Sequence, residues 1–413
     1  MTLREKAYEI LKDVYLQHAY ASLSLRALKD GYSEQNQAYL TALVYGTLQN
    51  DLFVRNAWQK YVKKMPKEEV ALLLDMATYE VLFMRSKDYA VINECVEIAK
   101  KIPHTRADGF VNQVLRKVAE FRDTSIESED PLKRLSLTYS IPQWIISLWM
   151  AHYKGEDTMK TLESLKKNSP QYLRVNTLKI TKEELLRKDD RWTDCGEDAL
   201  IYAGNYLRSS WFKEGYVFVQ DLHSQKVASF AGLEQGMRIL DLCAAPGSKT
   251  LHMAALCQNR CEITAVDLYQ SRLKLIEEGA KKAGADCIRI LQADAREINQ
   301  YLQEESFDCV FVDAPCSGLG VLRHKNDIKL HISPESIDEI VQLQKEILNA
   351  ASNMVRKGGT LIYSTCTLNK KENERQMEVF LDEHPDFAME KMRTYFPYED
   401  EADGFFMVKC VRV

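Results

Sequence analysis

Two cysteines, Cys316 and Cys366, follow apolar segments of the kind that form buried strands. Cys316 lies in DAPCSGLG, directly after the run FDCVFV at 307–312, and Cys366 lies in the segment TLIYSTCT. An unpaired cysteine is most often a small buried apolar residue, and otherwise a metal ligand or a reactive thiol. The position of both residues at strand ends, within polar turns, favours a reactive pair that faces one crevice. The residues alone leave open which thiol is the nucleophile.

Four aspartates end four successive apolar segments, at Asp241, Asp267, Asp294 and Asp313. In an open α/β sheet, ligands bind outside the carboxyl ends of the strands. Asp267 follows the second strand, where a carboxylate accepts hydrogen bonds from the ribose hydroxyls of an adenosine cofactor. Asp294 follows the third strand and could accept from the adenine amino group. Each aspartate alone is a weak signal, because aspartate also ends strands and caps helices.

The segment CAAPGSK, residues 243–249, is a turn of small residues that opens a helix and lets backbone approach a ligand closely. It lacks the GxGxxG pattern of dinucleotide-binding turns. It also lacks the upstream glycine and the Gly-Lys-Ser/Thr order of a P-loop, which excludes a nucleotide triphosphatase of that class. Cys243 lies inside this turn, where a packing or backbone role is sufficient.

These residues must be positioned by an alternation of strands and helices that begins near Gly236. The predicted strands are MRILDLC, EITAVDL, CIRILQAD, FDCVFVDAPC and TLIYSTCT, with helices between them. Ser333 and Pro334 predict the start of a long helix, and Gly358-Gly359 predicts its end. Such alternation predicts a doubly wound, Rossmann-like parallel sheet over residues 236–413.

The first half of the chain has a different pattern. Up to about Phe121 the apolar spacing is helical and glycine and proline are rare, which predicts an all-α bundle over residues 1–125. The polar segment RDTSIESEDP, residues 122–131, is the best linker candidate. Residues 132–235 mix helical patterns with the strand-like YLRVNTLK and GYVFVQD, which predicts a small α+β lead-in subdomain.

Composition limits the class of protein. With 413 residues and 46% hydrophobic content, the chain is long enough for two or three globular domains. The charged start and the lack of a long apolar run predict a cytoplasmic protein without a membrane span. The ten cysteines include no CxxC pair, which predicts reduced thiols. Cys257 and Cys261 have i,i+4 spacing on a predicted helix, but no second ligand pair accompanies them, so no metal site is predicted.

Several of these segments carry a family resemblance. DLCAAPGSKT, AVDL, QADA, VDAPCSGLGVLRHKNDIK and YSTCT resemble, in order and spacing, the motifs of S-adenosylmethionine-dependent RNA cytosine-C5 methyltransferases. YLRVNTLK, VFVQD and DGFFMVK are similar to that family's flanking motifs. LVYGTLQN, ATYEVLFM, YAVINECVEIAK and FVNQVLRKV resemble the NusB-like helical RNA-binding domain. This fusion is typical of the RsmB (Sun/Fmu) type of 16S ribosomal RNA methyltransferase.

The resemblance implies a role for each site residue. Cys366 attacks C6 of the cytosine, Cys316 assists breakdown of the covalent adduct, and Asp313 hydrogen-bonds the base at N3 and the exocyclic amine. The implied S-adenosylmethionine-binding residues are Cys243, Ala244, Ala245, Pro246, Gly247, Ser248, Lys249, Asp267, Arg272, Asp294 and Asp313. Lys249 could meet the methionine carboxylate or be an ordinary exposed helix lysine. Arg272 and Lys409 could contact cofactor or RNA phosphate, and a surface salt bridge is the simpler interpretation of both.

The implied partner is 16S ribosomal RNA, free or in an assembling small subunit, and the protein is expected to be a monomer. Arg323, His324, Lys325 and Lys329 follow the Cys316 turn and could hold RNA phosphate. The sequence departs from the family at Ser248, at Asn326 and at Leu222-His223, and none of these positions carries the chemistry. Alternatives stay open: the same chemistry on another ribosomal or transfer RNA cytosine, a non-catalytic RNA-binding assembly factor, or a redox or metal-binding cysteine pair.

Overall fold

A computed structural model describes residues 1–28, 31–167 and 169–413 of the chain. By its internal contacts the chain forms two compact units. The first consists of Met1–Lys166 with Leu322–His331, and the second of Lys167–Val321 with Ile332–Val413. The domains predicted at 1–125, 132–235 and 236–413 follow sequence motifs, and their boundaries stay predictions. None of the described helices combines the length and the apolar character needed to cross a membrane.

The first unit is helical, as the apolar spacing predicts. Its helices are α1 (Leu3–Gln17), α2 (Ala21–Arg26), α3 (Glu34–Gln49), α4 (Asp51–Gln59), α5 (Glu68–Phe83), α6 (Asp88–Lys100), α7 (Asp108–Phe121), α8 (Pro131–Tyr139), α9 (Gln143–His152), α10 (Gly155–Ser164) and α16 (Ile328–His331). Helix α1 begins at a capping box formed by Thr2 and Glu5, which satisfies backbone donors at its first turn. Helix α5 is buried along most of its length and packs against α1, α3, α4, α6 and α7. It is therefore the central helix of this core.

One piece of the first unit comes from far along the chain. The segment Leu322–His331 packs with the helices, and Leu330 contacts their core. Lys329 is 5% exposed, and its ammonium donates to Asp51 Oδ1 at 2.6 Å and to the Ser140 carbonyl oxygen. The prediction that Lys329 holds RNA phosphate is therefore wrong, because its charge is used inside the core. Within the same segment, His324 and Lys325 are exposed and Arg323 is buried.

The second unit begins with a small antiparallel sheet of strand order β2-β3-β1-β4. Its elements are β1 (Tyr172–Val175), α11 (Lys182–Lys188), β2 (Trp192–Asp194), β3 (Ala199–Tyr202), η1 (Tyr206–Arg208), α12 (Ser210–Lys213) and β4 (Val217–Val219). Strands β1 and β4 are the two that the sequence predicts, and they pair directly. Strands β2 and β3 are too short to show a clear alternation.

The larger sheet has the order β10-β11-β9-β8-β5-β6-β7. Its strands are β5 (Arg238–Asp241), β6 (Glu262–Asp267), β7 (Ile288–Gln292), β8 (Phe307–Asp313), β9 (Val355–Thr365), β10 (Phe387–Tyr395) and β11 (Phe405–Arg412). The other elements are α13 (Leu222–Ala231), α14 (Ser248–Leu256), α15 (Gln270–Ala283), η2 (Ala295–Gln300), α17 (Pro334–Met354) and α18 (Glu374–Glu383). The five strands predicted from sequence pair in parallel, which confirms the doubly wound arrangement. The antiparallel strands β10 and β11 extend the sheet and were not predicted.

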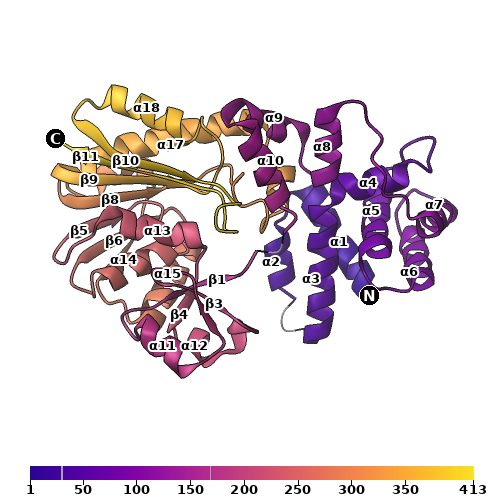
Figure 1. The fold of residues 1–413 in the computed structure, drawn as a ribbon, viewed down its shortest axis with the longest axis horizontal. Helices are drawn as coiled ribbons and strands as arrows, with labels where there is room; N and C mark the ends of the chain where they lie inside the picture. The colour runs from indigo at the N-terminus through magenta and orange to yellow at the C-terminus, as the bar shows by residue number, and fades with distance from the viewer. Residues whose placement is uncertain (29–30, 168) are drawn as a thin grey trace. The chain divides into compact units, whose positions relative to one another are not determined.

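Helices cover both faces of this sheet. In Figure 1, α17 and α18 lie on one face and α13, α14 and α15 on the other. Alternate residues of β8 point into the two cores, with Val310 and Val312 on the α17 side and Cys309 and Phe311 on the α13 side. The central strands are therefore buried on both faces, which explains their nearly continuous apolar sequence.

Two sequence predictions in this unit are wrong at the ends of helices. Helix α17 begins at Ser333-Pro334 as predicted, but it ends at Met354, before Gly358-Gly359. These glycines lie within β9, where a Cβ on Gly359 would come within 3.0 Å of the Asp308 carbonyl oxygen. Glycine is needed there for close strand contact and not to end a helix. Helix α14 ends at Leu256, so Cys257 and Cys261 do not share a helix.

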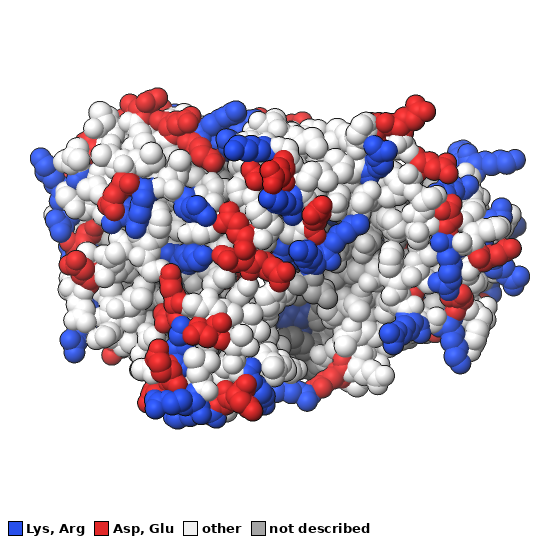
Figure 2. Space-filling model, viewed as in Figure 1, with Lys and Arg blue, Asp and Glu red and all other residues white. Residues whose placement is uncertain are grey.

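Surface charge is mixed in sign. On the face drawn in Figure 2, lysine and arginine side chains alternate with aspartate and glutamate and do not form one basic block. This agrees with the formal net charge of −5. Any contact with a polyanion would therefore depend on local groups.

Candidate active site

The two predicted cysteines lie together. Strands β8 and β9 are parallel neighbours, with Asp313 opposite Ser364, so the turns that follow them leave the sheet side by side. The Cys316 and Cys366 sulfur atoms are 3.4 Å apart. The backbone N–H of Gly320 donates to the Cys366 carbonyl oxygen at 3.1 Å, which ties the two turns together. The prediction that both thiols face one site is confirmed.

The two thiols do not share the same protonation behaviour. The pKa of Cys316 is raised well above its usual value, first by the hydrogen bond with the Cys366 sulfur and then by burial. Negative charge on Cys366 and on Glu372 acts in the same direction. The Cys366 sulfur and burial therefore both favour the neutral form of the Cys316 thiol.

Asp313 stands beside the thiols with both of its carboxylate oxygens oriented. Oδ1 accepts from the Ser364 hydroxyl at 2.8 Å, and Oδ2 accepts from the Lys249 ammonium at 2.7 Å. Burial lowers the pKa of Lys249, but Asp313 more than offsets this, so the pKa lies above its usual value. The Lys249 side chain is 12% exposed. Lys249 is thus not the exposed helix lysine of one alternative but a partner of Asp313, and its contact with the methionine carboxylate stays a prediction.

The turn at residues 243–249 is as tight as its small residues predict. The Ala244 N–H donates to the Val266 carbonyl oxygen at 2.9 Å, which joins the turn to β6. Gly247 has a φ of +102°, and a Cβ there would lie 3.3 Å from Ile276 on α15. Only glycine fits this position without strain. The backbone N–H groups at the start of α14 are therefore open to a ligand above the sheet.

Asp267 ends β6 beside this turn and is 4% exposed. Its carboxylate accepts from the backbone N–H groups of Ala245 at 3.3 Å and Tyr269 at 3.2 Å. Arg272 lies 3.3 Å from the same carboxylate and also donates to the Ala245 carbonyl oxygen. A fixed acceptor next to a glycine turn fits the ribose of an adenosine-containing cofactor.

Deeper in the turn, two groups are buried without being reactive. Burial raises the pKa of Cys243 far above its usual value, so this thiol stays neutral, as its predicted packing role requires. Burial also raises the pKa of Asp241 to about 7, although its Oδ2 accepts from the Thr250 hydroxyl at 2.7 Å. Asp241 therefore supports the turn from below and is not exposed to a ligand.

Asp294 and Lys409, two further residues predicted from the sequence, each form an ion pair with a neighbouring side chain. Asp294 lies two residues beyond β7, and its carboxylate pairs with Arg296 at 2.7 Å. The hydrogen bond from Arg296 lowers the pKa of Asp294, so the carboxylate is ionised and already engaged. Lys409 pairs with Glu390 at 3.2 Å, which confirms the salt-bridge interpretation.

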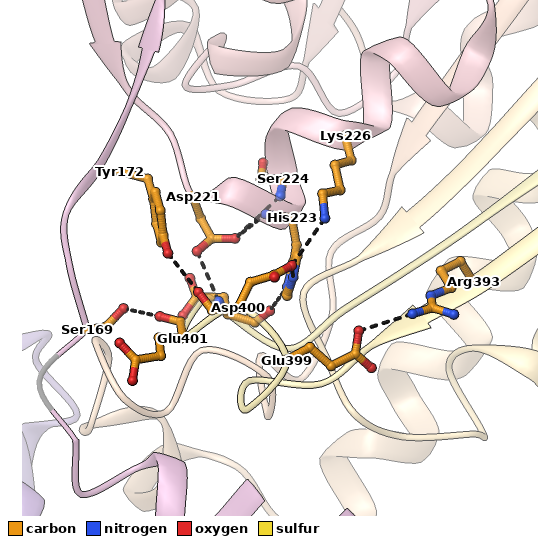
Figure 3. Close-up of polar contacts among 11 residues, drawn as sticks. Ser169, Tyr172, Asp221, His223, Ser224, Lys226, Arg393, Glu399, Asp400 and Glu401 are labelled. Carbon is orange, nitrogen blue, oxygen red and sulfur yellow. Dashed lines mark hydrogen bonds and ion pairs between the residues drawn. The ribbon is translucent and has the colours of Figure 1, made fainter. Parts of the chain in front are cut away.

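The sequence did not predict the residues that support Asp313 and the Cys316 turn. Ser364, which orients Asp313, and the loop between β10 and β11 are examples. Figure 3 shows this loop against the start of α13, with His223 between the chain segments. His223 is fully buried, and its Nδ1–H donates to the Asp403 carbonyl oxygen at 2.6 Å. Asp221 accepts from the Asp403 N–H at 2.9 Å.

This anchored loop reaches the Cys316 turn. The Gly404 N–H donates to the Gly320 carbonyl oxygen at 2.8 Å, and a Cβ on Gly320 would lie 2.1 Å from the Gly404 carbonyl oxygen. His223, where the sequence departs from the family pattern, thus fixes the loop at Asp403. The next residue, Gly404, packs against the Cys316 turn. In the sequence, this loop is marked by the family-like segment DGFFMVK, which begins at Asp403. That segment does not predict a contact with His223.

Comparisons with known proteins cover the whole chain. A family model described as 16S rRNA methyltransferase RsmB/F matches residues 230–411. A model of the NusB family matches residues 1–120, and a ferredoxin-like domain model of RsmF/B-like methyltransferases matches residues 141–188. Residues 230–411 include the thiol pair, Asp313 and the turn at residues 243–249.

Curated relatives align over their full length. The chain is 34% identical to the probable ribosomal RNA small subunit methyltransferase B of Bacillus subtilis (strain 168), covering 98% of each chain. It is 29% identical to the ribosomal RNA small subunit methyltransferase B of Salmonella paratyphi B, over 99% of this chain and 98% of that protein.

Solved structures share the fold. The crystal structure of PH0851 superposes with a TM-score of 0.83 and 25% identity over 98% of both chains. NSun6 from Pyrococcus horikoshii, solved with SFG, gives a TM-score of 0.61 at 22% identity over 66% of this chain and 98% of that one. The chain belongs to the RsmB/Sun family of S-adenosylmethionine-dependent ribosomal RNA methyltransferases.

Proposed function

We propose that the protein methylates C5 of a cytosine in 16S ribosomal RNA through a covalent adduct between Cys366 and C6 of the base. The observation that supports this most directly is the Cys316–Cys366 pair, with sulfur atoms 3.4 Å apart beside the oriented carboxylate of Asp313. The name of the Bacillus subtilis relative supports the choice of small-subunit RNA. The paired thiols support the choice of base and atom.

The first step uses the difference between the thiols. Cytosine C5 is a weak nucleophile, and addition of a thiolate at C6 makes it electron-rich. Cys366 supplies the thiolate, because the raised pKa of Cys316 keeps that neighbour neutral. A new C6–S bond forms, and the displaced electron pair moves into the ring toward C5 and N3.

Asp313 and Lys249 hold the base during this step. An ionised carboxylate can only accept, so Asp313 pairs with the exocyclic amine of cytosine. Lys249, 2.7 Å from Asp313, is the donor available to N3 as negative charge develops there.

The residues at 243–249, with Asp267 and Arg272, hold the cofactor, and Asp294 lies at the adenine end. Bound S-adenosylmethionine supplies an electrophilic methyl group and retains the electron pair of the broken S–CH3 bond. The turn that would position that group is joined to β6 by the Ala244 N–H, which donates to the Val266 carbonyl oxygen.

Product release requires loss of the C5 proton and return of the C6–S electron pair to Cys366. Once its sulfur is bonded to carbon, Cys366 no longer carries the negative charge that raises the pKa of Cys316. Cys316 then gives its own proton to solvent and takes the C5 proton, while the C5–H electron pair forms the C5=C6 double bond. The same contact thus keeps Cys316 inactive before attack and releases it afterwards.

The target base must leave its stack to reach this site, so a loop or a distorted helix is the expected RNA element. The NusB-like helical region would enlarge the RNA footprint and select the site. We retain the predictions that the protein acts in the cytoplasm, as a monomer, on free or assembling small-subunit RNA.

The test is transfer of labelled methyl from S-adenosylmethionine to unmodified 16S RNA, followed by nucleoside analysis. 5-Methylcytosine is the expected product. If the cofactor binds and 16S RNA, both free and in small-subunit particles, gains no label, the proposed function is wrong. Label in a different nucleoside would retain the family and overturn the cysteine mechanism.

A further inference from the structure

Glu372 is a buried carboxylate that the proposed mechanism does not use. It lies six residues after Cys366, just before α18, and its side chain is fully buried. Oε2 accepts from the Ser317 backbone N–H at 2.8 Å and from Gln344 Nε2 at 3.1 Å. Oε1 accepts from Asn369 Nδ2 at 2.8 Å and from the Ser317 hydroxyl. Four neutral donors therefore fill the acceptor positions of the carboxylate. Burial raises the pKa of Glu372, and the hydrogen bonds from Ser317, Asn369 and Gln344 act against that rise.

The partners of Glu372 flank the two catalytic thiols. Ser317 directly follows Cys316, and Thr367 directly follows Cys366, with their hydroxyl oxygens 2.7 Å apart. Because Ser317 gives its proton to Glu372, Thr367 must donate to Ser317 Oγ. The Leu319 N–H in turn donates to Thr367 Oγ1 at 3.2 Å. The carboxylate thus fixes the direction of a hydrogen-bond chain that crosses from one turn to the other.

The residue before Cys316 is also held by a hydrogen bond. Gln344, on α17, donates to the Pro315 carbonyl oxygen at 2.9 Å as well as to Glu372. The residues immediately before and after Cys316 are therefore both held by the Glu372–Gln344 pair. On the Cys366 side, Glu372 accepts from Asn369, three residues after Cys366, and reaches Thr367 through the Ser317 hydroxyl.

We propose that Glu372 is a positioning residue that fixes the Cys316 turn at contact distance from the Cys366 sulfur. The predicted effect on methyl transfer rests on the proposed function, whereas the predicted effect on thiol geometry does not. Glu372→Gln keeps the size of the side chain but places an NH2 group against partners that are themselves donors. The Cys316 turn then loses part of its support, while the Cys366 turn keeps its place at the end of β9.

Thiol geometry can be measured without RNA. Diamide oxidises the two thiols to a disulfide, and its N=N bond takes up both electrons and both protons. We expect the Cys316–Cys366 disulfide, followed by peptide mass spectrometry, to form about tenfold more slowly in Glu372→Gln than in the unmodified protein. Glu378→Gln, on the exposed face of α18, is the matched control and should not change the rate.

The kinetic arm separates positioning from general damage. In Glu372→Gln we expect kcat for methyl transfer to fall by about 10- to 100-fold, as for small misplacements of reacting groups, with KM for S-adenosylmethionine nearly unchanged. The RNA–protein adduct should accumulate, because the Cys316 step is the one that slows. Glu372→Asp, which keeps the charge, should recover part of the disulfide rate and part of kcat.

The outcomes are distinct. An unchanged disulfide rate in Glu372→Gln overturns the proposal, whatever happens to kcat. A slower disulfide without any cytosine methylation by the unmodified protein retains the positioning role and rejects the proposed function. If Glu372→Gln does not fold, Ser317→Ala removes a donor without leaving a buried charge unpaired, and the same rates decide the question.

Discussion

The helical unit and the sheet unit both bury carboxylates, but they compensate them in different ways. In the helical unit, Asp51 pairs with Lys329, Asp75 with Arg55 at 2.6 Å, and Glu80 with Arg4 at 2.8 Å. Each of these three buried acids is paired with a cation, whereas Asp327 in the same unit accepts from the Ala21 backbone N–H at 2.9 Å. Breaking one such pair leaves a buried charge without compensation, which is costly.

In the sheet unit, buried acids are held mainly by neutral donors. Glu372 accepts from serine, asparagine and glutamine, and Asp241 accepts from a threonine hydroxyl. Lys249, a cation of the candidate site, pairs instead with the partly exposed Asp313. The helical unit thus uses ion pairs to hold its core together. The sheet unit orients its turns with neutral donors and keeps its ion pair at the site.

The largest effect should come from the thiols themselves. Cys366→Ala should lower methyl transfer by at least about 1,000-fold, because the covalent route is removed. Cys316→Ala should instead accumulate the adduct, seen as RNA-shifted protein on a denaturing gel. Cys195→Ala, a cysteine remote from the site on the small sheet, is the control and should transfer methyl normally.

The reverse pattern, an adduct in Cys366→Ala and none in Cys316→Ala, would mean that the two roles are exchanged. It would also contradict the argument from the raised pKa of Cys316. Activity retained in both variants would remove the covalent mechanism altogether.

In the helical unit the largest effect should be on stability. Lys329→Met leaves Asp51 buried without its cation and should lower the free energy of unfolding by about 3–5 kcal/mol. Replacing both partners, with Asp51→Leu and Lys329→Met together, should recover most of that loss. Urea titration measures both, and Lys325→Met, at an exposed lysine of the same segment, should lie within about 0.5 kcal/mol of the unmodified protein.

Equal losses in the single and double variants would show that Lys329 acts through packing and not through its charge. A loss in RNA binding, with stability unchanged, would restore the sequence prediction that Lys329 contacts phosphate.

Lys329 also illustrates what the sequence could not provide. The thiol pair was predictable, because neighbouring parallel strands end at one edge and both cysteines follow such strands. The sheet was predictable from alternation. A lysine after the Cys316 turn looks like any basic loop residue until the tertiary fold places it against Asp51. The prediction that Gly358-Gly359 ends a helix was wrong for a related reason. The role of these glycines depends on a close contact with the Asp308 backbone and not on the local sequence.

The burial of Asp241 in the sheet unit predicts a dependence of stability on pH. The pKa of Asp241 is about 7 when folded, against an ordinary value of 3.8. The folded state therefore holds more protons between these values, and Asp241 makes stability fall as pH rises from about 4 to about 7. The slope should reach up to roughly 1.4 kcal/mol per pH unit.

Urea titrations at several pH values measure this slope. Asp241→Asn, which cannot ionise but can still accept from Thr250, should show a flatter dependence across the same range. If both proteins have the same slope, Asp241 is ionised throughout this pH range. The sheet unit then tolerates a buried charge without a paired cation at this position.

The smallest effect separates two carboxylates at the cofactor edge. Asp267 is buried and held by backbone donors, whereas Asp294 is partly exposed and already paired with Arg296, like a surface ion pair. Asp267→Asn should weaken S-adenosylmethionine binding by about 100-fold, through loss of charge-assisted hydrogen bonds to the ribose. Asp294→Asn should weaken it by no more than about fivefold, because Arg296 competes for that carboxylate. Calorimetric titration measures both, with Asp382→Asn on α18 as the control. Equal losses would place the adenine amine directly on Asp294, and Arg296→Ala should then tighten binding by removing the competitor.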